Sequence, residues 1–142
     1  MTITVRVVTH ASERDAAFDI RRRVFQEEQG VTAGDEFDAD DARATHVLAT
    51  AGETPVGTGR IVFRADDAKI GRMAVQKDWR GRSVGRAIME ELTRIANARK
   101  VRRLVLHAQV QAIPFYARLG FHIVGKEFEE AGIPHRRMER EL

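Results

Sequence analysis

Residues 70–87 read Ile70-Gly71-Arg72-Met73-Ala74-Val75-Gln76-Lys77-Asp78-Trp79-Arg80-Gly81-Arg82-Ser83-Val84-Gly85-Arg86-Ala87. Apolar residues up to Val75 predict a short strand, and the apolar periodicity from Val84 predicts an amphipathic helix. The loop between them is basic and contains glycine, so its backbone can approach a ligand closely. A loop that enters a helix also presents unpaired N–H groups and the positive end of the helix dipole. The segment therefore predicts a binding site for a pyrophosphate group.

Two common phosphate-binding motifs are absent from this loop. No Gly-Lys-Ser or Gly-Lys-Thr follows the glycines, which excludes a Walker A loop, and the Gly-x-Gly-x-x-Gly pattern of dinucleotide-binding folds does not occur. On these residues alone, an ordinary strand–helix connection with solvated arginines stays open as the alternative.

The size and composition of the chain indicate one globular domain over residues 1–142. Hydrophobic residues make up 43% and charged residues 32%, a balance that differs from that of disordered chains. No cysteine occurs, which excludes a disulfide framework, a thiolate nucleophile and a cysteine-ligated metal. Neither Ser12 nor Ser83 lies in a nucleophile-elbow pattern. Covalent catalysis through serine or cysteine is therefore not expected.

Charge is distributed unevenly along the chain, although the net charge is only +3. Residues 24–42 contain seven acidic residues and neither lysine nor arginine, whereas residues 60–103 contain 13 basic and five acidic residues. One end of the fold is thus predicted to suit a cation and another end a polyanion. Two solvated faces of opposite charge are the alternative interpretation.

Hydrophobic patterns predict an α+β fold in which a sheet is layered with helices. Alternating or apolar segments predict strands at residues 3–8, 46–50, 56–63, 70–75, 104–108, 121–124 and 136–139. Helices are predicted to begin at a capping box formed by Ser12 and Asp15, at Val84 and at Pro114. The acidic residues 30–43 show no periodicity and are predicted to form a long loop with at most one turn.

Two segments resemble motifs of the GNAT acyltransferase superfamily. The basic loop is similar to motif A, Arg/Gln-x-x-Gly-x-Gly/Ala, with Arg80 and Gly85 in place and Ser83 at the position of the first glycine. The run Phe115-Tyr116…Leu119-Gly120-Phe121 resembles motif B, and Gln109 stands where asparagine is common.

Two further segments resemble a narrower subfamily of small bacterial GNAT proteins. They read Arg22-x-x-Phe25-x-x-Glu28-Gln29-Gly30 and Phe128-x-Glu130-x-Gly132-Ile133-Pro134-His135. The resemblance implies the GNAT acyl-CoA N-acyltransferase fold, an α+β fold that has a mixed, mostly antiparallel central sheet with helices on both faces. It also implies that two central strands of this sheet splay apart.

The resemblance implies acetyl-CoA as the acyl donor and gives the residues that would bind it. The backbone of Met73 and Val75 is expected to pair with the pantetheine amides, and the N–H of Ala74 to polarise the thioester carbonyl. The basic loop is expected to hold the pyrophosphate. The implied cofactor-binding residues are Met73, Ala74, Val75, Arg80, Gly81, Arg82, Ser83, Val84, Gly85, Arg86, Gln109 and Tyr116.

The resemblance also implies that a primary amine attacks the thioester directly in a ternary complex. Tyr116 occupies the motif B position whose hydroxyl protonates the departing thiolate, and a core aromatic residue is the alternative interpretation. The amine must itself lose a proton, and Glu28, which matches the Glu-Gln pair of the subfamily, is the favoured base. Glu27, His107, His135 and a water chain stay open for this role.

The residues expected to contact the acceptor are Glu27, Glu28, Gln29, His107 and His135. Because His107 alternates with Leu106 and Ala108, its side chain should point to the opposite face of the sheet, and a structural histidine is the alternative. The acidic residues 24–42 predict a cationic acceptor: a small primary amine, a polyamine or an amine of a peptide.

No metal partner is expected, since the five histidines show no ligand spacing. The lack of a secretory segment and of a membrane-spanning apolar run predicts a cytoplasmic protein without a membrane partner. The oligomeric state stays open, with a homodimer as the alternative to a monomer.

Two rival functions also stay open: an acyl-CoA sensor without turnover, and a basic nucleic-acid-binding module, which the 6% of aromatic residues disfavours.

Overall fold

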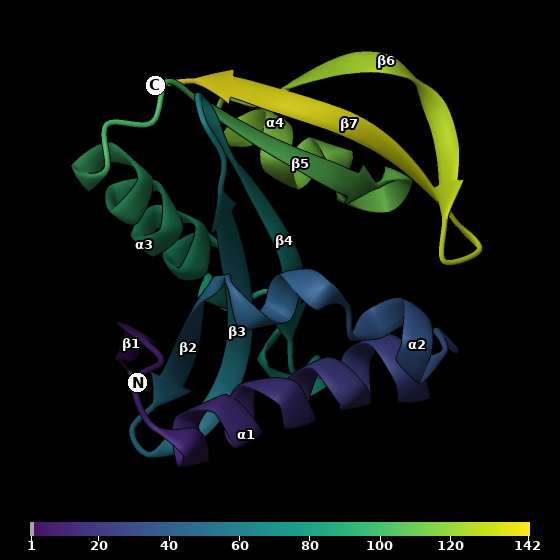
Figure 1. Ribbon diagram of the computed structural model, residues 1–142. Helices are drawn as coiled ribbons and strands as arrows, with labels where there is room; N and C mark the ends of the chain where they lie inside the picture. The colour runs from purple at the N-terminus through teal and green to yellow at the C-terminus, as the bar shows by residue number, and fades with distance from the viewer. Residues whose placement is uncertain (1) are drawn as a thin grey trace.

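Seven strands form one sheet in the order β1-β2-β3-β4-β5-β7-β6 in the computed structural model, which describes residues 2–142 (Figure 1). The strands are β1 (Ile3–Val7), β2 (Thr45–Ala51), β3 (Thr54–Phe63), β4 (Asp67–Val75), β5 (Arg103–Gln109), β6 (His122–Glu130) and β7 (Ile133–Glu141). All neighbouring strands are antiparallel except β4 and β5. The predicted mixed, mostly antiparallel sheet is thereby confirmed.

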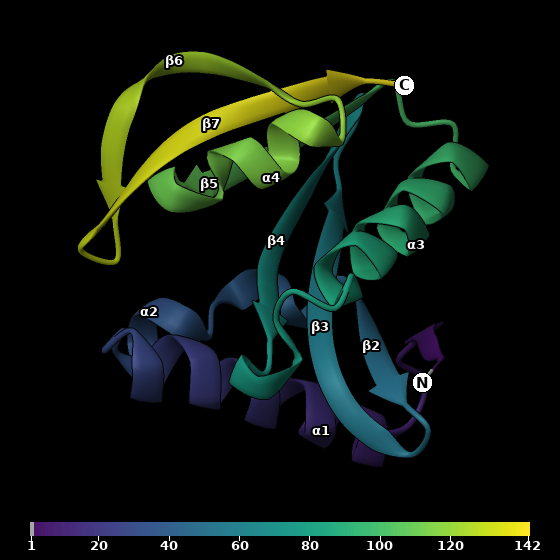
Figure 2. The same ribbon diagram turned by 180° about the vertical axis from the view of Figure 1, so that it is seen from behind.

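Helices cover both faces of this sheet (Figures 1 and 2). One face carries α1 (Ala11–Arg21), its π-helical continuation η1 (Arg22–Glu28), α2 (Ala33–Glu36) and the short 3₁₀ helix η2 (Ala39–Ala42). The other face carries α3 (Val84–Ala98) and α4 (Ile113–Arg118). Two further 3₁₀ turns are η3 (Lys77–Trp79) and η4 (Val110–Ala112).

Each face has its own hydrophobic core. On one side, Ala17, Ile20 and Val24 of the first helix pack on Leu48 and Ala74 of the sheet. On the other side, the apolar face of α3 lies on the centre of the sheet, with Val84, Ile88, Met89 and Leu92 among its buried residues. The predicted period of α3 is thus confirmed, because the residues at helical spacing are the ones removed from water.

Three details of the predicted secondary structure are wrong. The capping box is formed by His10 and Glu13 rather than by Ser12 and Asp15, because the carboxylate of Glu13 accepts the N–H groups of Thr9 and His10, both at 3.0 Å. Residues 30–43 contain α2 and η2 rather than an open loop, since Thr32 and Asp38 cap these two short helices. The sixth strand continues beyond residue 124 to Glu130, and its partner, the seventh strand, begins at Ile133 rather than at residue 136.

Glycine residues in β3 let α3 approach the sheet closely. A Cβ atom on Gly57 would lie 2.9 Å from Ile88 Cδ1 and 3.2 Å from the carbonyl oxygen of Ala74. Gly59 is equally crowded, because a Cβ atom there would lie 2.8 Å from Met73 Sδ. Neither position has room for a side chain unless the helix moves.

We expect Gly57→Ala to lower the free energy of unfolding by about 1–3 kcal/mol, the usual cost of overpacking a filled core. Urea unfolding followed by circular dichroism measures this loss as a lower midpoint at unchanged slope. Gly34→Ala is the matched control, because a Cβ there meets nothing within 4 Å. Equal stabilities of the two variants would contradict the close contact between α3 and β3.

The strands β4 and β5 separate halfway along the sheet. Their parallel pairing runs only from Asp67 opposite Arg103 to Ile70 opposite Leu106. Beyond these pairs, residues 71–75 and 107–109 diverge, as Figure 1 shows. The predicted splayed strands are confirmed, and the gap between them is where the candidate site lies.

Candidate functional site

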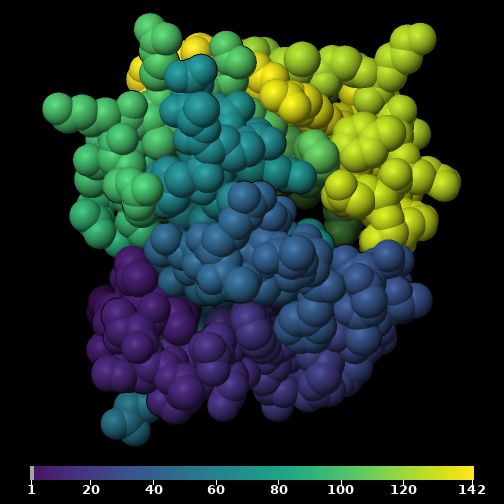
Figure 3. All heavy atoms as spheres, in the orientation of Figure 1, coloured from purple at the N-terminus to yellow at the C-terminus, as the bar shows by residue number. Residues whose placement is uncertain are grey.

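A cavity of about 820 Å³ occupies the space between the diverging strands. Its walls come from β4, β5, the start of α3, α4, the end of η1, α2 and the hairpin of β6 and β7. Figure 3 shows it as a hollow on the face of α1 and α2, between residues near 40 in blue and the β6–β7 hairpin in yellow-green. The cavity thus reaches both faces of the sheet.

The start of α3 forms one end of this cavity. Its N-cap residue, Ser83, has φ +65° and makes no side-chain cap, so the first N–H groups of the helix are left for a ligand or water. Gly81 has φ +75°, a conformation that favours glycine. Gly85 lies under Phe115, whose Cζ would be 3.2 Å from a Cβ. The absence of a side chain at Gly85 therefore makes room for α4.

The arginines of the predicted phosphate loop already contact other side chains. Arg80 donates to both carboxylate oxygens of Glu28, at 2.7 and 3.0 Å, and to the carbonyl of Val75 at 3.1 Å. Arg86 donates to Glu90 at 3.1 Å on the surface. The guanidinium of Arg82 lies 4.9 Å from the centre of the Trp79 ring, and Arg82 does not line the cavity. Arg80 and Arg86 do line it.

The edge of β4 and the helix α4 form the middle of the cavity. Met73, Ala74 and Val75 line it where β4 has lost β5 as a neighbour. Tyr116 also lines it, with 8% of its surface exposed and its ring packed edge-on against Phe121. Burial raises the pKa of Tyr116 above its ordinary value, so the phenol keeps its proton at neutral pH. Its hydroxyl can therefore donate a proton or a hydrogen bond.

Glu27 and Glu28 do not line this cavity, although Arg80, the partner of Glu28, does. Both glutamates line a separate, smaller cavity of about 390 Å³ near η3. Glu27 pairs with Arg22, and Glu28 pairs with Arg80. The structure does not bring these two carboxylates together with the other predicted acceptor residues.

Gln29, in contrast, lines the main cavity together with Gln109. The amide of Gln109 donates to that of Gln29 at 3.0 Å, across 80 positions of sequence. This contact joins the end of η1 to the end of β5. It closes one side of the gap between the diverging strands.

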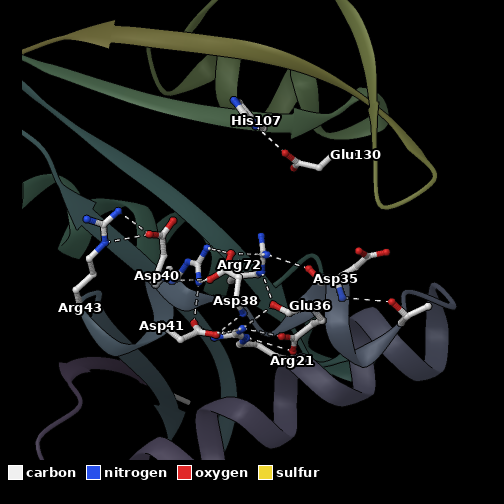
Figure 4. A network of polar contacts seen from close by, with 12 residues as sticks. Arg21, Asp35, Glu36, Asp38, Asp40, Asp41, Arg43, Arg72, His107 and Glu130 are labelled. Carbon is white, nitrogen blue, oxygen red and sulfur yellow. Dashed lines mark hydrogen bonds and ion pairs between the residues drawn. The ribbon is translucent and has the colours of Figure 1, made fainter.

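The acidic segment is largely neutralised by arginines from other elements (Figure 4). Arg21 of α1 pairs with Glu36 at 2.6 Å and with Asp41 at 2.7 Å. Asp38 accepts from Arg60 of β3 at 2.7 Å and from Arg72 of β4 at 3.0 Å. The predicted negative surface is thus wrong for Glu36, Asp38 and Asp41, because their countercharges come from residues outside the segment.

These contacts also change the pKa of Asp41. Burial alone would raise it, but the hydrogen bonds and charges of Arg21 and Arg60 lower the pKa of Asp41 to about 2. Asp41 is therefore ionised at neutral pH and balanced within the network. Asp35 is exposed at the rim of the cavity and makes none of these ion pairs.

Opposite this network, His107 and His135 lie around a carboxylate that the sequence interpretation gave no role. Glu130 Oε1 is 2.9 Å from Nδ1 of His107, and Glu130 Oε2 is 3.8 Å from Nε2 of His135 (Figure 4 labels His107 and Glu130). The hydrogen bond from His107, more than the burial that opposes it, lowers the pKa of Glu130 to about 2. His107 faces this cavity, as its alternation with Leu106 and Ala108 predicts.

Lys69 is a second cavity-lining residue that the sequence interpretation missed. Its side chain is half-buried, and this burial lowers the pKa of its ammonium group. Within residues 2–142 it makes no ion pair, unlike Arg60 and Arg72 nearby. Lys69 lies one residue before the end of the β4–β5 pairing, and this position in the sheet brings its side chain to the cavity.

Neither a metal centre nor a membrane span is found in the part of the chain that the structure describes. No three His, Cys, Asp or Glu side chains of residues 2–142 are grouped so that they could hold a metal ion. No helix in the same range is long and apolar enough to cross a membrane.

Known protein families and proteins include relatives of this chain. A family model described as "Acetyltransferase (GNAT) domain" matches residues 11–142. The uncharacterized N-acetyltransferase YjcF of Bacillus subtilis is 38% identical over 126 residues, which cover 88% of this chain and 90% of YjcF. The protein ElaA of Escherichia coli is 33% identical over 137 residues, which cover 92% of this chain and 89% of ElaA.

Solved structures share the fold. The crystal structure of Escherichia coli ElaA superimposes with a TM-score of 0.86 at 29% identity, covering 99% of this chain and 100% of ElaA. A GNAT family acetyltransferase of Elizabethkingia anophelis, crystallised with acetyl-CoA bound, gives a TM-score of 0.78 at 15% identity, covering 99% of this chain and 98% of its own. This second likeness concerns the fold alone.

Proposed function

This chain belongs to the GNAT acetyltransferase family, and from this premise we propose that it transfers an acetyl group from acetyl-CoA to a primary amine. The observation that supports this proposal most directly is the cavity between β4 and β5, which is continuous with the uncapped start of α3. An elongated donor fits there with its diphosphate at the helix and its thioester at the strand edge. The acetyl-CoA bound to the Elizabethkingia anophelis protein supports this donor.

The residues at the start of α3 fit the diphosphate. The free N–H groups after Ser83 and the positive end of the helix dipole favour an anion, and Arg86 adds a cation at the cavity wall. Arg80 would exchange its contact with Glu28 for the phosphate. Arg82, which stacks on Trp79, would contribute only long-range charge.

The middle of the cavity fits the rest of the donor. Met73 and Val75 would pair through their backbone with the amides of the pantetheine arm, although Arg80 already takes the carbonyl of Val75. The N–H of Ala74 would polarise the thioester carbonyl. Gln109 would contact the arm from β5.

The proposed reaction forms one carbon–nitrogen bond and breaks one carbon–sulfur bond. The amine nitrogen attacks the acetyl carbon directly in a ternary complex, and the CoA thiolate leaves. Tyr116 would give the thiolate its proton and regain one from the nitrogen of the new amide. The acceptor ammonium must also give a proton to a base before it attacks.

Gln29, His107 and His135 are proposed to contact this acceptor, since all three line the cavity. Glu28 stays a predicted base, but its ion pair with Arg80 and its place in the smaller cavity favour a different residue. Glu27 also lines the smaller cavity, where it pairs with Arg22. A homodimer and a cytoplasmic location also stay predictions.

A thiol-release assay tests the proposal. The chain and acetyl-CoA are incubated in turn with amino acids, amino sugars, polyamines and peptides, and the free CoA thiol is measured. Acceptor-dependent release supports acetyl transfer. Tight acetyl-CoA binding without release for any acceptor would favour the non-catalytic sensor instead.

The diphosphate site leads to a prediction about affinity. We expect CoA to bind at least tenfold more tightly than pantetheine, which lacks the phosphates, when both are measured by calorimetry at low salt. Arg86→Gln should weaken CoA binding roughly three- to tenfold by removing a charge-assisted contact. Arg94→Gln is the matched control, because Arg94 makes a similar surface pair with Glu91 but lies away from the helix start. Equal affinity for CoA and pantetheine would contradict the diphosphate site.

A further inference from the structure

The acceptor side of the cavity lies on the sheet face that carries α1 and α2. Ile70, Leu106 and Ala108 pack into the core under α3 and α4. Lys69 and His107 alternate with them and therefore point to the opposite face. Register places His135 of β7 opposite Gln109 of β5, on the same face as His107. Three polar side chains thus surround the point where β4 and β5 separate.

His107 is arranged as a base. Nδ1 lies 2.9 Å from the Glu130 carboxylate, which can only accept, so Nδ1 carries the hydrogen. In the neutral ring this leaves Nε2 with a free lone pair, and the carboxylate stabilises the imidazolium that forms when Nε2 takes a proton. The ring of Phe128 packs edge-on against His107, with its centre 5.0 Å away. Glu130 is a positioning residue that fixes the tautomer and the ring.

His135 supports the same carboxylate from the other side. Its Nδ1 is 2.6 Å from the carbonyl oxygen of Ile133, so this nitrogen donates and Nε2 faces Glu130 at 3.8 Å. The imidazole is 7% exposed and stacks on Phe128. His135 is therefore held within the wall, whereas His107 is the more accessible of the two rings.

Lys69 supplies a positive charge beside this base. It lies opposite Val105, two residues before His107 on the neighbouring strand, so Lys69 and His107 are diagonal neighbours on one face. Arg60 and Arg72, the other cations on this side of the cavity, are paired with Asp38. The half-buried ammonium of Lys69 makes no ion pair among residues 2–142, and the nearby carboxylate whose charge acts on it is that of Glu130. An anion carried by a ligand would supply an ion-pair partner.

We propose that the acceptor is an amine that also carries a carboxylate, such as a free amino acid, with Lys69 binding the carboxylate and His107 taking a proton from the amine. Glu130 and Lys69 bring opposite charges into the part of the cavity that His107 lines, which matches the opposite charges of an amino acid. Lys69 and His107 are diagonal neighbours across the pairing of β4 and β5, so one small ligand that carries both an amine and a carboxylate can reach both side chains. This inference rests on the proposed acetyl transfer and names its substrate class.

The proton balance is complete with the residues present. The acceptor ammonium loses one proton to Nε2 of His107, and its nitrogen then bonds to the acetyl carbon. The carbon–sulfur bond breaks, the thiolate takes the proton of Tyr116, and Tyr116 recovers a proton from the nitrogen. The products are the N-acetyl amino acid, CoA thiol and one proton that His107 releases to water.

The experiment compares acceptors that differ only in the carboxylate: L-phenylalanine with 2-phenylethylamine, and L-lysine with 1,5-diaminopentane. We expect the amino acid of each pair to have the lower KM in the acetyl-CoA assay. Lys69→Met should raise the KM of the amino acids tenfold or more and should not raise that of the diamine or phenylethylamine, because these acceptors carry no carboxylate for Lys69 to bind. Lys69→Arg, which keeps the charge, should retain the preference. Lys126→Met is the control, because Lys126 is exposed on β6 outside the cavity lining.

The base is tested separately. His107→Gln should lower kcat for both members of a pair by about 10²–10⁴-fold, the usual contribution of one general base, with little change in CoA affinity. Glu130→Gln should lower kcat less, and Glu130→Asp should restore part of that loss. A kcat that these changes leave intact would overturn the assignment of His107 and Glu130.

The outcomes separate the inference from the proposed function. If the amines without a carboxylate are acetylated with the lower KM, and Lys69→Met does not alter the order, the substrate class is wrong while acetyl transfer stands. If neither member of any pair releases thiol although acetyl-CoA binds, the proposed function fails and the inference fails with it.

Discussion

Replacement of Tyr116 by phenylalanine is expected to lower kcat by about 10²–10⁴-fold and to leave the affinity for CoA unchanged. The hydroxyl is the only group removed, and burial keeps it protonated at neutral pH because it raises the pKa of Tyr116. The same dry environment raises the proton affinity of a departing thiolate, so a neutral donor beside it has a large effect on the rate. The aromatic contacts with Phe115 and Phe121 are kept by the new ring.

The measurement must report the chemical step. Single-turnover mixing of the acetyl-CoA complex with a saturating acceptor measures the rate of acetyl transfer without product release. Circular dichroism and a CoA titration on the same protein show whether fold and donor binding are intact. A Tyr116→Phe variant that transfers acetyl at the wild-type rate would exclude Tyr116 as the acid.

The sequence predicts those parts of the molecule whose signals are local. The apolar period from Val84 fixes α3, and the basic glycine-containing loop before it predicts the uncapped helix start that the structure contains. The alternation around His107 predicts the face to which this side chain points. Such patterns involve neighbours within one element, so they are visible without knowledge of the fold.

The electrostatic predictions fail where partners are distant in sequence. Glu28 and Arg80 are 52 positions apart, yet each neutralises the other. Arg72 reaches Asp38 across 34 positions. A count of charges within residues 24–42 cannot show these pairings, because the sheet brings the arginines to the acidic segment only after folding.

Glu130 was missed for a related reason. Its position beside His107 depends on how far β6 extends and on its register with β7. The two strands lose register between Val124 and Phe128, so the pairing of Phe128 with His135 does not follow from simple counting. Phe128 and Glu130 are two positions apart in the same strand, and this spacing is the one local signal that their side chains share a face of the sheet.

The largest loss of stability is expected at the buried ion pair of Arg21 and Glu36. Both side chains are 1% exposed, and Arg21 also reaches Asp41. The guanidinium packs against the neighbouring rings of Phe18 and Phe37, with distances of 4.9 and 5.0 Å to their centres. Arg21 thereby joins α1 to α2 and η2, which form one wall of the cavity.

We expect Arg21→Met to lower the free energy of unfolding by about 3–5 kcal/mol, because it leaves the Glu36 carboxylate buried without its cation. Combining it with Glu36→Gln should recover part of the loss, since no buried charge then lacks a partner at this position. Arg43→Met is the matched control: Arg43 also pairs with a carboxylate, Asp40, at 2.6 Å, but its side chain is 67% exposed. An exposed pair contributes only about 0–1 kcal/mol, so urea midpoints should separate the two arginines clearly. If Arg21→Met lowers the free energy of unfolding no more than Arg43→Met does, the buried pair does not hold α1 to the acidic segment. The wall of the acceptor cavity then depends on Arg60 and Arg72 instead.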